Sequence, residues 1–400
     1  MECVVLAAGE GKRMRPLTTK RPKVMLPLVN RPMIEHLVIS AREAGIKDFV
    51  FVVGYHEQEI RKHFMDGSPF GVNIRYVTQR HQRGTADALA AAENLISGRF
   101  LMLNGDMILK SDDIRDICAC TAPCMGVTPS THPQDFGVVT VDGSVVTGLV
   151  EKSETPPGNL INAGVYLFDP EIFEKLSLLK LSERGELELT DALSDYINSR
   201  SLNAFSLSSW MDVGEPWDIL DANESMLSDL EPDIKGDIED FVTITGPVTL
   251  GEGSVILAGT CIDGPCIIGR GCKIGPHAYI RGSTAIGDNC HIGHCTEIKN
   301  SVIFPGTKIP HFNYIGDSVI GSGCNFGAGT KIANLRHDHG HVKVSGRDTG
   351  RKKFGAVVGD LVQFGINCSI NVGSVIGSGV KVAPGSSVEG HISGDTVIGR

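Results

Sequence analysis

The 400-residue sequence is poor in aromatic side chains, in positive charge and in long apolar runs. Aromatic residues make up 6% of it, whereas glycine occurs 48 times, a balance that favours a turn-rich chain. The net charge of −10 argues against binding to nucleic acid or to anionic membranes. No apolar run is long enough to span a bilayer, and no basic segment followed by an apolar stretch opens the chain. We therefore expect a cytoplasmic protein without a membrane span or a signal peptide.

The sequence also lacks the cysteine spacing of a disulfide framework or a zinc finger. Five of its 11 cysteines stand two residues before a regularly repeated apolar residue: Cys266, Cys272, Cys290, Cys324 and Cys368. Residues two apart on a strand share one face, so we interpret these thiols as small core residues in a reducing compartment. The cluster Cys118, Cys120 and Cys124 leaves zinc binding open, although no second ligand pair follows it.

A six-residue repeat of apolar residues marks the second half of the chain. It runs through Leu250, Ile256, Ile262, Ile268, Ile274, Ile280, Ile286, Ile292 and Ile298, and it returns at Val358, Phe364, Ile370, Ile376, Val382 and Val388. A period of six fits neither a helix nor a single strand. It is the hexapeptide signature of a parallel β-helix, in which residues 18 apart lie above one another in adjacent coils. Because 400 residues exceed one ordinary core, we predict two domains, 1–230 and 236–400, the second being the β-helix.

Short apolar strands alternate with helices in the first domain. The pattern predicts strands at 4–8, 48–53, 74–77 and 100–103, and helices at 33–44, 56–64 and 85–96. A strand-rich section at 136–168 and a helical stretch at 216–230 follow. The alternation indicates a Rossmann-like parallel α/β sheet covered on both faces. Ligands of such sheets bind at the carboxyl ends of strands, so we expect chemistry in the loops after Ala8 and Leu103.

The first of these loops is rich in glycine and in cations. It contains Gly9 and Gly11, and Arg15 and Lys23 follow. Glycines let the backbone approach a ligand, and the two cations suit a polyphosphate. The third glycine of the dinucleotide fingerprint and the Gly-Lys-Ser/Thr triplet of a P-loop are both absent.

With Asn104-Gly105-Asp106 and Trp210-Met211-Asp212-Val213-Gly214, the first 225 or so residues resemble the sugar-1-phosphate nucleotidylyltransferases. The resemblance implies that Arg15 and Lys23 are catalytic and that Asp106 and Asp212 bind Mg²⁺. It implies nucleotide contacts at Leu6, Ala8, Gly9, Gln79, Gly84 and Thr85, and sugar-phosphate contacts at Gly137, Glu151, Lys152 and Asn162. Two carboxylates plus phosphate oxygens are a ligand set that Mg²⁺ accepts. Each residue alone also fits a plainer role: Asp106 a helix cap, Asp212 a turn and Lys152 a solvated charge.

Two cations interrupt the repeat where glycine is common. Arg281 follows Ile280 and Lys299 follows Ile298, 18 residues later, so the two should stack about 5 Å apart on adjacent coils. Stacked like charges repel, which an anionic ligand such as a phosphate would relieve. The plainer alternative is two solvated side chains on a turn.

The repeat then slips, because Ile320 follows Ile315 after only five residues, next to the segment that contains His311. A polar excursion from Leu335 to Lys353 breaks the coil soon afterwards. Insertions in a solenoid leave as loops, commonly on a binding face. Histidine is a suitable general base for an amine near neutral pH.

From about residue 245 to 390 the chain resembles the left-handed β-helix acyltransferases, most closely the acetyltransferase domain of bifunctional enzymes that make UDP-N-acetylglucosamine. The resemblance implies a catalytic His311 and a homotrimer. It implies sugar-phosphate contacts at Arg281, Lys299, Tyr314, Asn325 and Lys353, and acetyl-coenzyme A contacts at Ala328 and Asn334. This chain departs from the family in its longer excursion before Lys353, in Ile366 where a serine is usual, and in having no basic tail before Arg400, as in archaeal forms.

The sequence leaves several choices open. UTP and dTTP differ little, and Gln79 would contact either base; glucosamine and galactosamine 1-phosphates differ at one stereocentre. One alternative is a nucleotidylyltransferase whose β-helix serves only assembly or regulation. A second is a non-catalytic scaffold, against which the joint presence of Arg15, Lys23, Asp106 and Asp212 argues.

Overall fold

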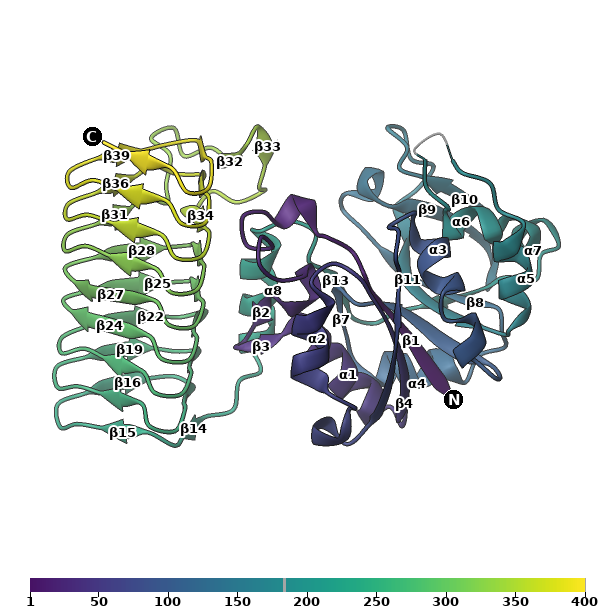
Figure 1. Ribbon diagram of the computed structural model, residues 1–400, viewed down its shortest axis with the longest axis horizontal. Helices are drawn as coiled ribbons and strands as arrows, with labels where there is room; N and C mark the ends of the chain where they lie inside the picture. The colour runs from purple at the N-terminus through teal and green to yellow at the C-terminus, as the bar shows by residue number, and fades with distance from the viewer. Residues whose placement is uncertain (183–184, 400) are drawn as a thin grey trace. The chain divides into compact units, whose positions relative to one another are not determined.

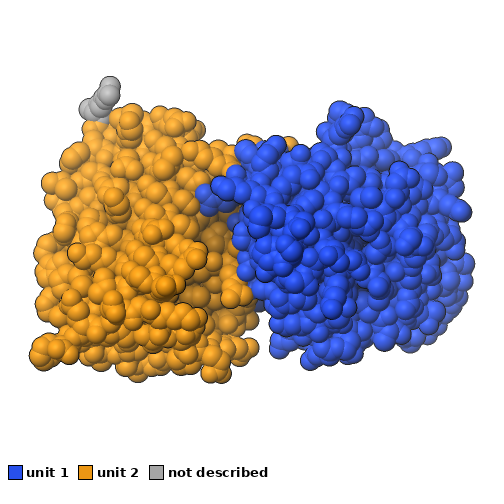
Figure 2. Space-filling model, turned by 60° about the horizontal axis from the view of Figure 1, so that its bottom comes forward, with its two compact units in different colours: residues 1–10, 21–25, 33–212 blue, residues 11–20, 26–32, 213–400 orange. Residues whose placement is uncertain are grey.

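The computed structural model describes residues 1–182 and 185–399 (Figure 1). The chain packs into two compact units, coloured in Figure 2: residues 1–10, 21–25 and 33–212 form unit 1, and residues 11–20, 26–32 and 213–400 form unit 2. Unit 2 thus includes two short N-terminal segments and the helix before the β-helix. The division into domains 1–230 and 236–400, made from the sequence, stays a prediction. Among the described residues, no helix is both long and apolar enough to cross a membrane.

Unit 1 is built on a nine-stranded sheet in the order β5-β4-β1-β6-β11-β8-β12-β10-β9. The predicted parallel arrangement holds for β5, β4, β1 and β6, whereas β11 runs antiparallel to both β6 and β8. The strands are β1 (Glu2–Ala7), β4 (Asp48–Val53), β5 (Asn73–Thr78), β6 (Phe100–Asn104), β8 (Cys124–Pro129), β9 (Gly137–Asp142), β10 (Val145–Glu151), β11 (Leu160–Phe168) and β12 (Asn203–Ser206). The antiparallel part comes from the strand-rich section after residue 136, and β8 and β12 were not expected.

Helices cover both faces of this sheet, as predicted. Along β1, Cys3 and Val5 pack in the core with α1 and α4, whereas Val4 packs in the core with α3 and α5. The helices of unit 1 are α1 (Met33–Glu43), α2 (Glu57–Phe64), α3 (Thr85–Ala90), α4 (Ser111–Cys118), α5 (Glu171–Ser177), α6 (Leu189–Ala192) and α7 (Ser194–Asn198). Strands β7 (Met107–Leu109) and β13 (Trp210–Asp212) form a separate antiparallel pair.

Unit 2 is a left-handed β-helix of three parallel sheets, seen as the stacked arrows of Figure 1. The first sheet consists of β14 (Asp233–Ile234), β17 (Val248–Leu250), β20 (Cys266–Ile268), β23 (Thr284–Ile286), β26 (Val302–Ile303), β29 (Val319–Ile320), β34 (Ala356–Val358), β37 (Ser374–Ile376) and β40 (His391–Ile392). The second consists of β15 (Asp237–Ile238), β18 (Val255–Ile256), β21 (Lys273–Ile274), β24 (His291–His294), β27 (Lys308–His311), β30 (Asn325–Phe326), β35 (Gln363–Phe364), β38 (Lys381–Val382) and β41 (Val397–Ile398). The third consists of β16 (Thr243–Thr245), β19 (Cys261–Asp263), β22 (Tyr279–Arg281), β25 (Glu297–Lys299), β28 (Tyr314–Gly316), β31 (Lys331–Ile332), β36 (Ser369–Ile370) and β39 (Ser387–Val388).

The repeated apolar residues form one continuous core inside the coils. Ile262, Ile280 and Ile298 are fully buried and stand in register on consecutive strands of the third sheet. The five cysteines predicted to fill this core are buried as well. Elsewhere, burial raises the pKa of the Cys118 thiol to about 11, and the described residues contain no cluster of three or more His, Cys, Asp or Glu able to hold a metal. The zinc alternative is therefore not supported.

Most irregularities of the β-helix fall at one corner, where the chain passes from the third sheet to the first. The step from Ile298 to Ile303 is five residues, as is the step from Ile315 to Ile320 in the next coil. The sequence interpretation noticed only the second shortening. In the following coil the excursion 335–353 leaves from the same corner, between β31 and β34. We call residues 299–301, 316–318 and 333–355 the irregular corner.

The remaining elements of unit 2 pack beside the coils. Helix α8 (Asp218–Leu227) donates from Asn223 Nδ2 to the Ser283 carbonyl at 2.9 Å. The short hairpin of β2 (Pro27–Leu28) and β3 (Arg31–Pro32) donates from Asn30 Nδ2 to the Ile286 carbonyl at 2.7 Å. The excursion folds into a hairpin of β32 (Lys343–Val344) and β33 (Arg347–Asp348).

Candidate active sites

The loop after β1 and the end of β6 lie side by side in unit 1. Leu6 is in register with Asn104, and the Gly105 amide donates to the Leu6 carbonyl at 2.9 Å. A Cβ at Gly105 would stand only 2.8 Å from that carbonyl oxygen, so a glycine is required for this close approach. The two loops predicted to carry chemistry therefore meet, bringing the Ala8–Gly9 turn to the same sheet edge as Asp106.

The strand pair β7–β13 sets the two predicted metal ligands near each other. Asp212 is in register with Met107, the residue that follows Asp106. Asp106 Oδ2 also accepts an ion-pair hydrogen bond from Lys23 Nζ at 2.5 Å, and the Lys23 side chain is buried. Oxygen donors of this kind fit Mg²⁺, which takes one or two carboxylates and completes its shell with phosphate and water oxygens.

The residues predicted to contact the nucleotide base are fixed by the backbone around them. Gln79 is buried, and its Nε2 donates to Asp87 Oδ2 at 2.7 Å and to the Gly84 carbonyl at 3.2 Å. Gly84 has a φ of 104°, and a Cβ there would meet the Leu187 carbonyl at 2.5 Å. Thr85 Oγ1 accepts from the Leu189 amide at 3.2 Å. Gln79, Gly84 and Thr85 are therefore held by hydrogen bonds at the start of α3.

The four predicted sugar-phosphate residues meet where β9, β10 and β11 adjoin. Gly137 is in register with Glu151, and a Cβ at Gly137 would stand 2.8 Å from Glu151 Oε2 and 3.7 Å from the Asn162 Cβ. Asn162 Nδ2 donates to the Tyr166 hydroxyl at 2.6 Å. Lys152 has a left-handed backbone, and its amide donates to the Phe136 carbonyl at 3.1 Å. The missing side chain of Gly137 lets the Glu151 carboxylate lie against its backbone, so these groups are held close together.

Arg15 is placed differently from the other predicted nucleotidyl-site residues. It belongs to the segment 11–20 of unit 2, in which Gly11 has a φ of 65° and its carbonyl accepts from the Met14 amide at 3.0 Å. Lys23 belongs to unit 1. The structure therefore does not bring the two predicted catalytic cations together within one unit.

The segment 11–20 contributes to a basic cavity within unit 2. The cavity has a volume of about 840 Å³, and its lining includes Lys12, Arg13, Arg15 and Lys20. Arg13, which the sequence interpretation did not single out, lies 3.5 Å from Glu215.

In the β-helix, Arg281 and Lys299 are in register on adjacent coils, as their spacing predicts. Each of the two cations has a carboxylate partner within the protein, which relieves part of their repulsion, and the phosphate contact stays a prediction. Arg281 Nη1 donates to Glu297 Oε1 at 2.9 Å, and this hydrogen bond raises the pKa of the Arg281 guanidinium. Lys299 Nζ lies 3.1 and 3.0 Å from the two carboxylate oxygens of Asp317.

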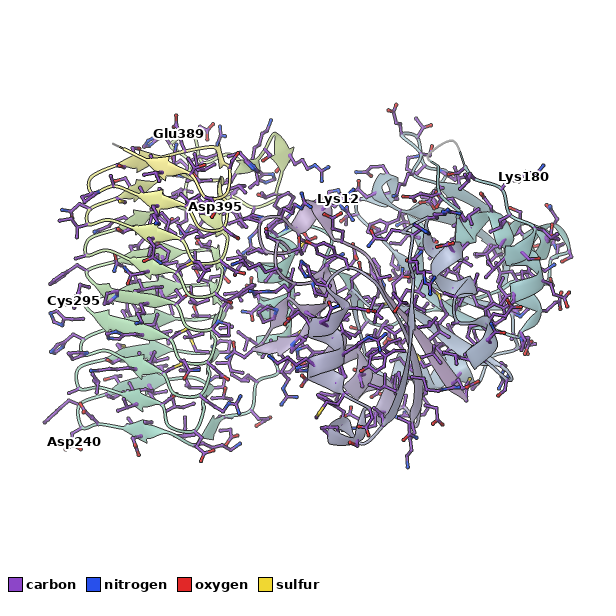
Figure 3. The ribbon with its side chains drawn as sticks, viewed as in Figure 1. Lys12, Lys180, Asp240, Cys295, Glu389 and Asp395 are labelled. Atoms are coloured by element: carbon purple, nitrogen blue, oxygen red, sulfur yellow. The ribbon has the colours of Figure 1, made fainter. Side chains whose placement is uncertain are left out.

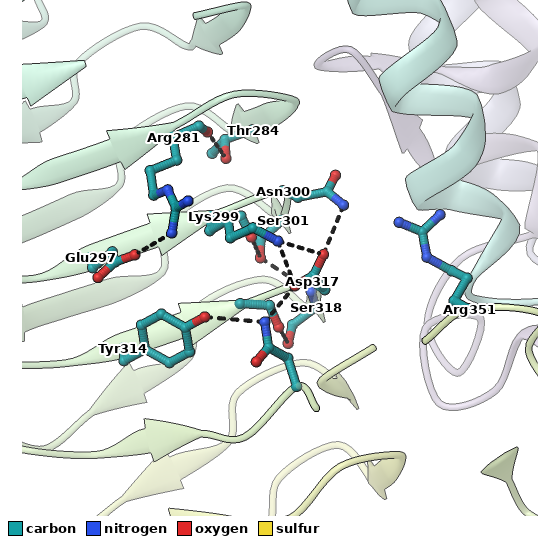
Figure 4. Close-up of polar contacts among 12 residues, drawn as sticks. Arg281, Thr284, Glu297, Lys299, Asn300, Ser301, Tyr314, Asp317, Ser318 and Arg351 are labelled. Atoms are coloured by element: carbon teal, nitrogen blue, oxygen red, sulfur yellow. Dashed lines mark hydrogen bonds and ion pairs between the residues drawn. The ribbon is translucent and has the colours of Figure 1, made fainter. Parts of the chain in front are cut away.

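Asp317 is the centre of a polar network at the irregular corner (Figure 4). Besides Lys299, it accepts from Asn300 Nδ2 at 2.9 Å and from Asn334 Nδ2 at 2.5 Å. Asn334 Nδ2 also donates to the Tyr314 hydroxyl at 3.1 Å, and burial raises the pKa of that phenol. Three predicted ligand contacts, Lys299, Tyr314 and Asn334, therefore meet through a residue to which the sequence interpretation gave no role.

His311 lies at the opposite end of the same stretch of chain, where β27 ends. It is exposed and in register with His294 of the preceding coil, and its carbonyl accepts from the Gly329 amide at 3.0 Å. Asn325 is in register with Lys308, which belongs to the preceding coil and to the same strand as His311. Asn325 and Ala328 therefore lie on the same side of the β-helix as His311. Strand β28 (Tyr314–Gly316) separates this group from Lys299 and Asp317.

Comparisons with known proteins cover both parts of the chain. A family model described as "Nucleotidyl transferase" matches residues 2–229, and one described as "GMPPB C-terminal domain" matches residues 262–394. The chain is 38% identical over 403 residues to the bifunctional protein GlmU of Methanocaldococcus jannaschii, covering 100% of the chain and 97% of that protein. The chain belongs to the bifunctional GlmU family.

Two further comparisons agree with this assignment. The chain is 38% identical over 405 residues to the bifunctional sugar-1-phosphate nucleotidylyltransferase/acetyltransferase of Sulfurisphaera tokodaii, covering 97% of each. A solved structure described as a glucose-1-phosphate thymidylyltransferase of Bacillus anthracis, in complex with sucrose, aligns with a TM-score of 0.54 at 29% identity, over 58% of this chain and 97% of that chain. The prediction of an enzyme with nucleotidyltransferase and acetyltransferase activities is confirmed.

The long excursion of this GlmU-family chain returns Lys353 to the irregular corner. Leu335 and Lys353 form an antiparallel bridge, and the Phe354 amide donates to the Asn334 carbonyl at 3.0 Å. The intervening residues are held elsewhere in unit 2, since Arg351 pairs with Asp221 of α8 and Arg347 pairs with Glu215. The added length therefore does not displace Lys353 from Asn334.

Sequence reasoning missed the residues that act as partners. Glu297 pairs with Arg281, and Asp317 pairs with Lys299 and accepts from Asn300. Gln82 donates to the Ala8 carbonyl at 2.7 Å. A signal was present for Asp317, because it stands 18 residues after Lys299 and next to the shortened step of the repeat.

Proposed function

We propose that the chain makes UDP-N-acetylglucosamine in two steps. Acetyl-coenzyme A first acetylates glucosamine 1-phosphate, and the N-acetylglucosamine 1-phosphate then accepts a uridylyl group from UTP with release of pyrophosphate. The observation that carries the proposal is the presence of two built sites in one chain: the Asp106–Asp212 pair held by β7–β13, and the Lys299–Asp317–Asn334 network of the β-helix.

For nucleotidyl transfer, a phosphate oxygen of the sugar attacks the α-phosphorus of UTP and pyrophosphate departs. Such reactions depend on positioning and on neutralising phosphoryl charge. Asp106 and Asp212 would hold a Mg²⁺ ion, which supplies that neutralisation when bound. Lys23, buried beside Asp106, supports the departing charge, while Glu151 and Lys152 hold the sugar phosphate; the catalytic role of Arg15 stays a prediction.

For acetyl transfer, the sugar 1-phosphate would lie along β28. Its phosphate faces Arg281 and Lys299 at one end, and its 2-amino group faces His311 at the other. His311 takes a proton from the amine as the nitrogen attacks the thioester carbon, the C–S bond breaks, and the proton passes to the coenzyme A thiolate. Both amide hydrogens of Asn334 are used by Asp317 and Tyr314, which favours a backbone amide near Ala328 for the oxyanion.

We further propose that the enzyme is a cytoplasmic homotrimer. Phe312, 55% exposed beside His311, has an apolar surface that a second copy of the chain would cover. Light scattering should give three times the 42.8 kDa of one chain.

A second function is favoured by one observation. The GMPPB C-terminal domain model matches residues 262–394, which supports a β-helix that serves assembly or regulation in a nucleotidylyltransferase. In that alternative the chain transfers a nucleotidyl group to glucose or mannose 1-phosphate and does not acetylate.

One experiment separates the two functions. The protein is incubated with acetyl-coenzyme A and glucosamine or galactosamine 1-phosphate while free thiol is followed, and separately with UTP, dTTP or GTP and each sugar 1-phosphate while pyrophosphate is followed. We expect thiol release with glucosamine 1-phosphate and pyrophosphate release with UTP and N-acetylglucosamine 1-phosphate. Pyrophosphate release without any thiol release would leave the β-helix as an assembly domain.

A further inference from the structure

We infer that Asp317 is a positioning residue of the acetyl-transfer site, which holds Lys299 in the geometry that binds the sugar phosphate and fixes Asn334 beside it. The inference rests on the proposed acetyl transfer and deepens it. Asp317 is 2% exposed, so it acts through its neighbours rather than by touching the substrate.

The contacts of Asp317 connect three successive coils. Lys299 and Asn300 come from the coil before it, and Asn334 follows β31 in the coil after it. The backbone is tied in the same way: the Asp317 amide donates to the Lys299 carbonyl at 2.9 Å, and the Gly355 amide donates to the Asp317 carbonyl at 2.8 Å. One side chain therefore fixes the relative positions of residues 17 or more apart in the sequence.

The chemistry of the pair suits a binding cation. A buried carboxylate is costly unless it is paired and hydrogen-bonded, and Asp317 has both kinds of partner. Lys299 remains 20% exposed. An ammonium has three donors, of which Asp317 accepts two, so the third can serve a phosphate oxygen. Lys299 is in register with Arg281, so a phosphate held there would also meet the guanidinium.

The excursion depends on the same carboxylate. Asn334 Nδ2 donates to Asp317 Oδ2, while the Asn334 carbonyl accepts from the Phe354 amide, next to Lys353. Moving Asp317 would therefore displace Lys299 and the base of the excursion together.

The plainer explanation is that Asp317 only suits the turn. Its φ is 50°, in the left-handed region where asparagine and aspartate are favoured. Asparagine would serve a turn equally well, so Asp317→Asn removes the charge and keeps the conformational preference. Asp395 provides a matched control, because it is an exposed aspartate with a φ of 56° at another corner of the β-helix.

The test measures acetyl transfer by Asp317→Asn, Asp395→Asn, Lys299→Met and the double variant Asp317→Asn/Lys299→Met. We expect Asp317→Asn to raise the KM for glucosamine 1-phosphate about tenfold or more, since small misplacements at a site cost up to about 100-fold. Because Asn334 also bonds to Tyr314 and Phe354, the KM for acetyl-coenzyme A should rise by less than the KM for the sugar phosphate, and both constants of Asp395→Asn should stay within about twofold. Because neighbouring residues that act as a unit are not additive, the double variant should match Lys299→Met.

Other outcomes would overturn the inference. An unchanged KM for the sugar phosphate in Asp317→Asn would do so, as would a parallel rise of both KM values with a lower melting midpoint, which indicates a merely structural role. If Asp317→Asn fails to fold, the double variant still decides, because it leaves no unpaired buried charge. A double variant far less active than Lys299→Met would show that Asp317 does not act through Lys299.

A binding measurement separates this inference from the proposed function. If the wild-type protein releases no thiol, acetyl transfer fails as a function, and calorimetric titration with glucosamine 1-phosphate then tests Asp317 alone. Binding weakened about tenfold by Asp317→Asn and not by Asp395→Asn would retain the positioning role, whereas equal affinities or no binding at all would reject it.

Discussion

In unit 1 the residues of the candidate site follow the ends of ordinary strands, whereas in the β-helix they lie where a strict repeat is interrupted. Asp106 follows β6 and Asp212 ends β13, and nothing in the local pattern distinguishes them from other polar residues after strands. In the β-helix, by contrast, two shortened steps and the excursion fall at one corner in three consecutive coils, and Lys299 and Asp317 are there. In a repeat, a candidate site can be recognised in the sequence where the period is broken. An α/β sheet has no such period, so its site residues are not marked in the same way.

The two regions should therefore respond differently to substitution. Each coil of a solenoid contacts mainly its neighbours, so changes at the irregular corner should alter one activity and spare the rest of the chain. In unit 1, the site residues are tied into the sheet edge itself, through contacts such as Lys23 with Asp106.

The largest effect is expected in unit 1. Asp106→Ala removes one predicted metal ligand and the partner of the buried Lys23, and we expect pyrophosphate release to fall by about 1000-fold, as for the loss of one strong electrostatic group. Acetyl transfer, measured as thiol release by the same preparation, should be unchanged. Loss of both activities in a folded oligomer would contradict the separation of the two sites.

The corresponding change in the β-helix is His311→Ala. Removing a general base should lower acetyl transfer by about 100-fold or more, with pyrophosphate release from UTP unaffected. His294→Ala is the matched control, because His294 is the register partner of His311 on the preceding coil and has no assigned role. A similar loss in both variants would mean that this corner needs imidazole for packing rather than for proton transfer.

The contrast between the regions also explains what the sequence could predict. The repeat gives the register of Arg281 with Lys299 without any structure, because 18 residues make one coil. It does not give the partner of Lys299, since the Asp317 side chain could equally have pointed outward at that turn. In unit 1 the strands and their loops are predictable from periodicity, but the antiparallel strand β11 beside β6 and the pairing of β13 with β7 depend on contacts across more than 60 residues.

A stability change tests whether the coils are independent of unit 1. Ile298 is fully buried between coils, so Ile298→Ala should cost about 2–5 kcal/mol through lost contact and a residual cavity. Thermal inactivation of acetyl transfer should shift to lower temperature, while nucleotidyl transfer keeps its midpoint. Ile392, only partly buried in one of the last coils, is the control, and Ile392→Ala should shift the midpoint less. Equal shifts of both activities after Ile298→Ala would indicate that the two regions unfold as one.

The smallest effect concerns the corner where the chain passes from the second sheet to the third, away from the proposed network. At this corner eight coils have a residue with positive φ: Phe241, Gly259, His277, Cys295, Phe312, Gly329, Asn367 and Gly385. Cys295, labelled in Figure 3, is exposed and has a φ of 52°, a conformation that costs ordinary residues about 1–2 kcal/mol and asparagine less. We therefore expect Cys295→Asn to stabilise the β-helix by up to about 1 kcal/mol, raising the midpoint of acetyl-transfer inactivation slightly without changing the rate.

Cys290→Asn in the core of the same coil should do the opposite, because it buries an amide among apolar side chains. If Cys295→Asn destabilises the protein, the 3.3 Å contact between the Cys295 thiol and His294 contributes more than the turn conformation does. In that case a non-glycine residue at this corner has a role other than forming the turn.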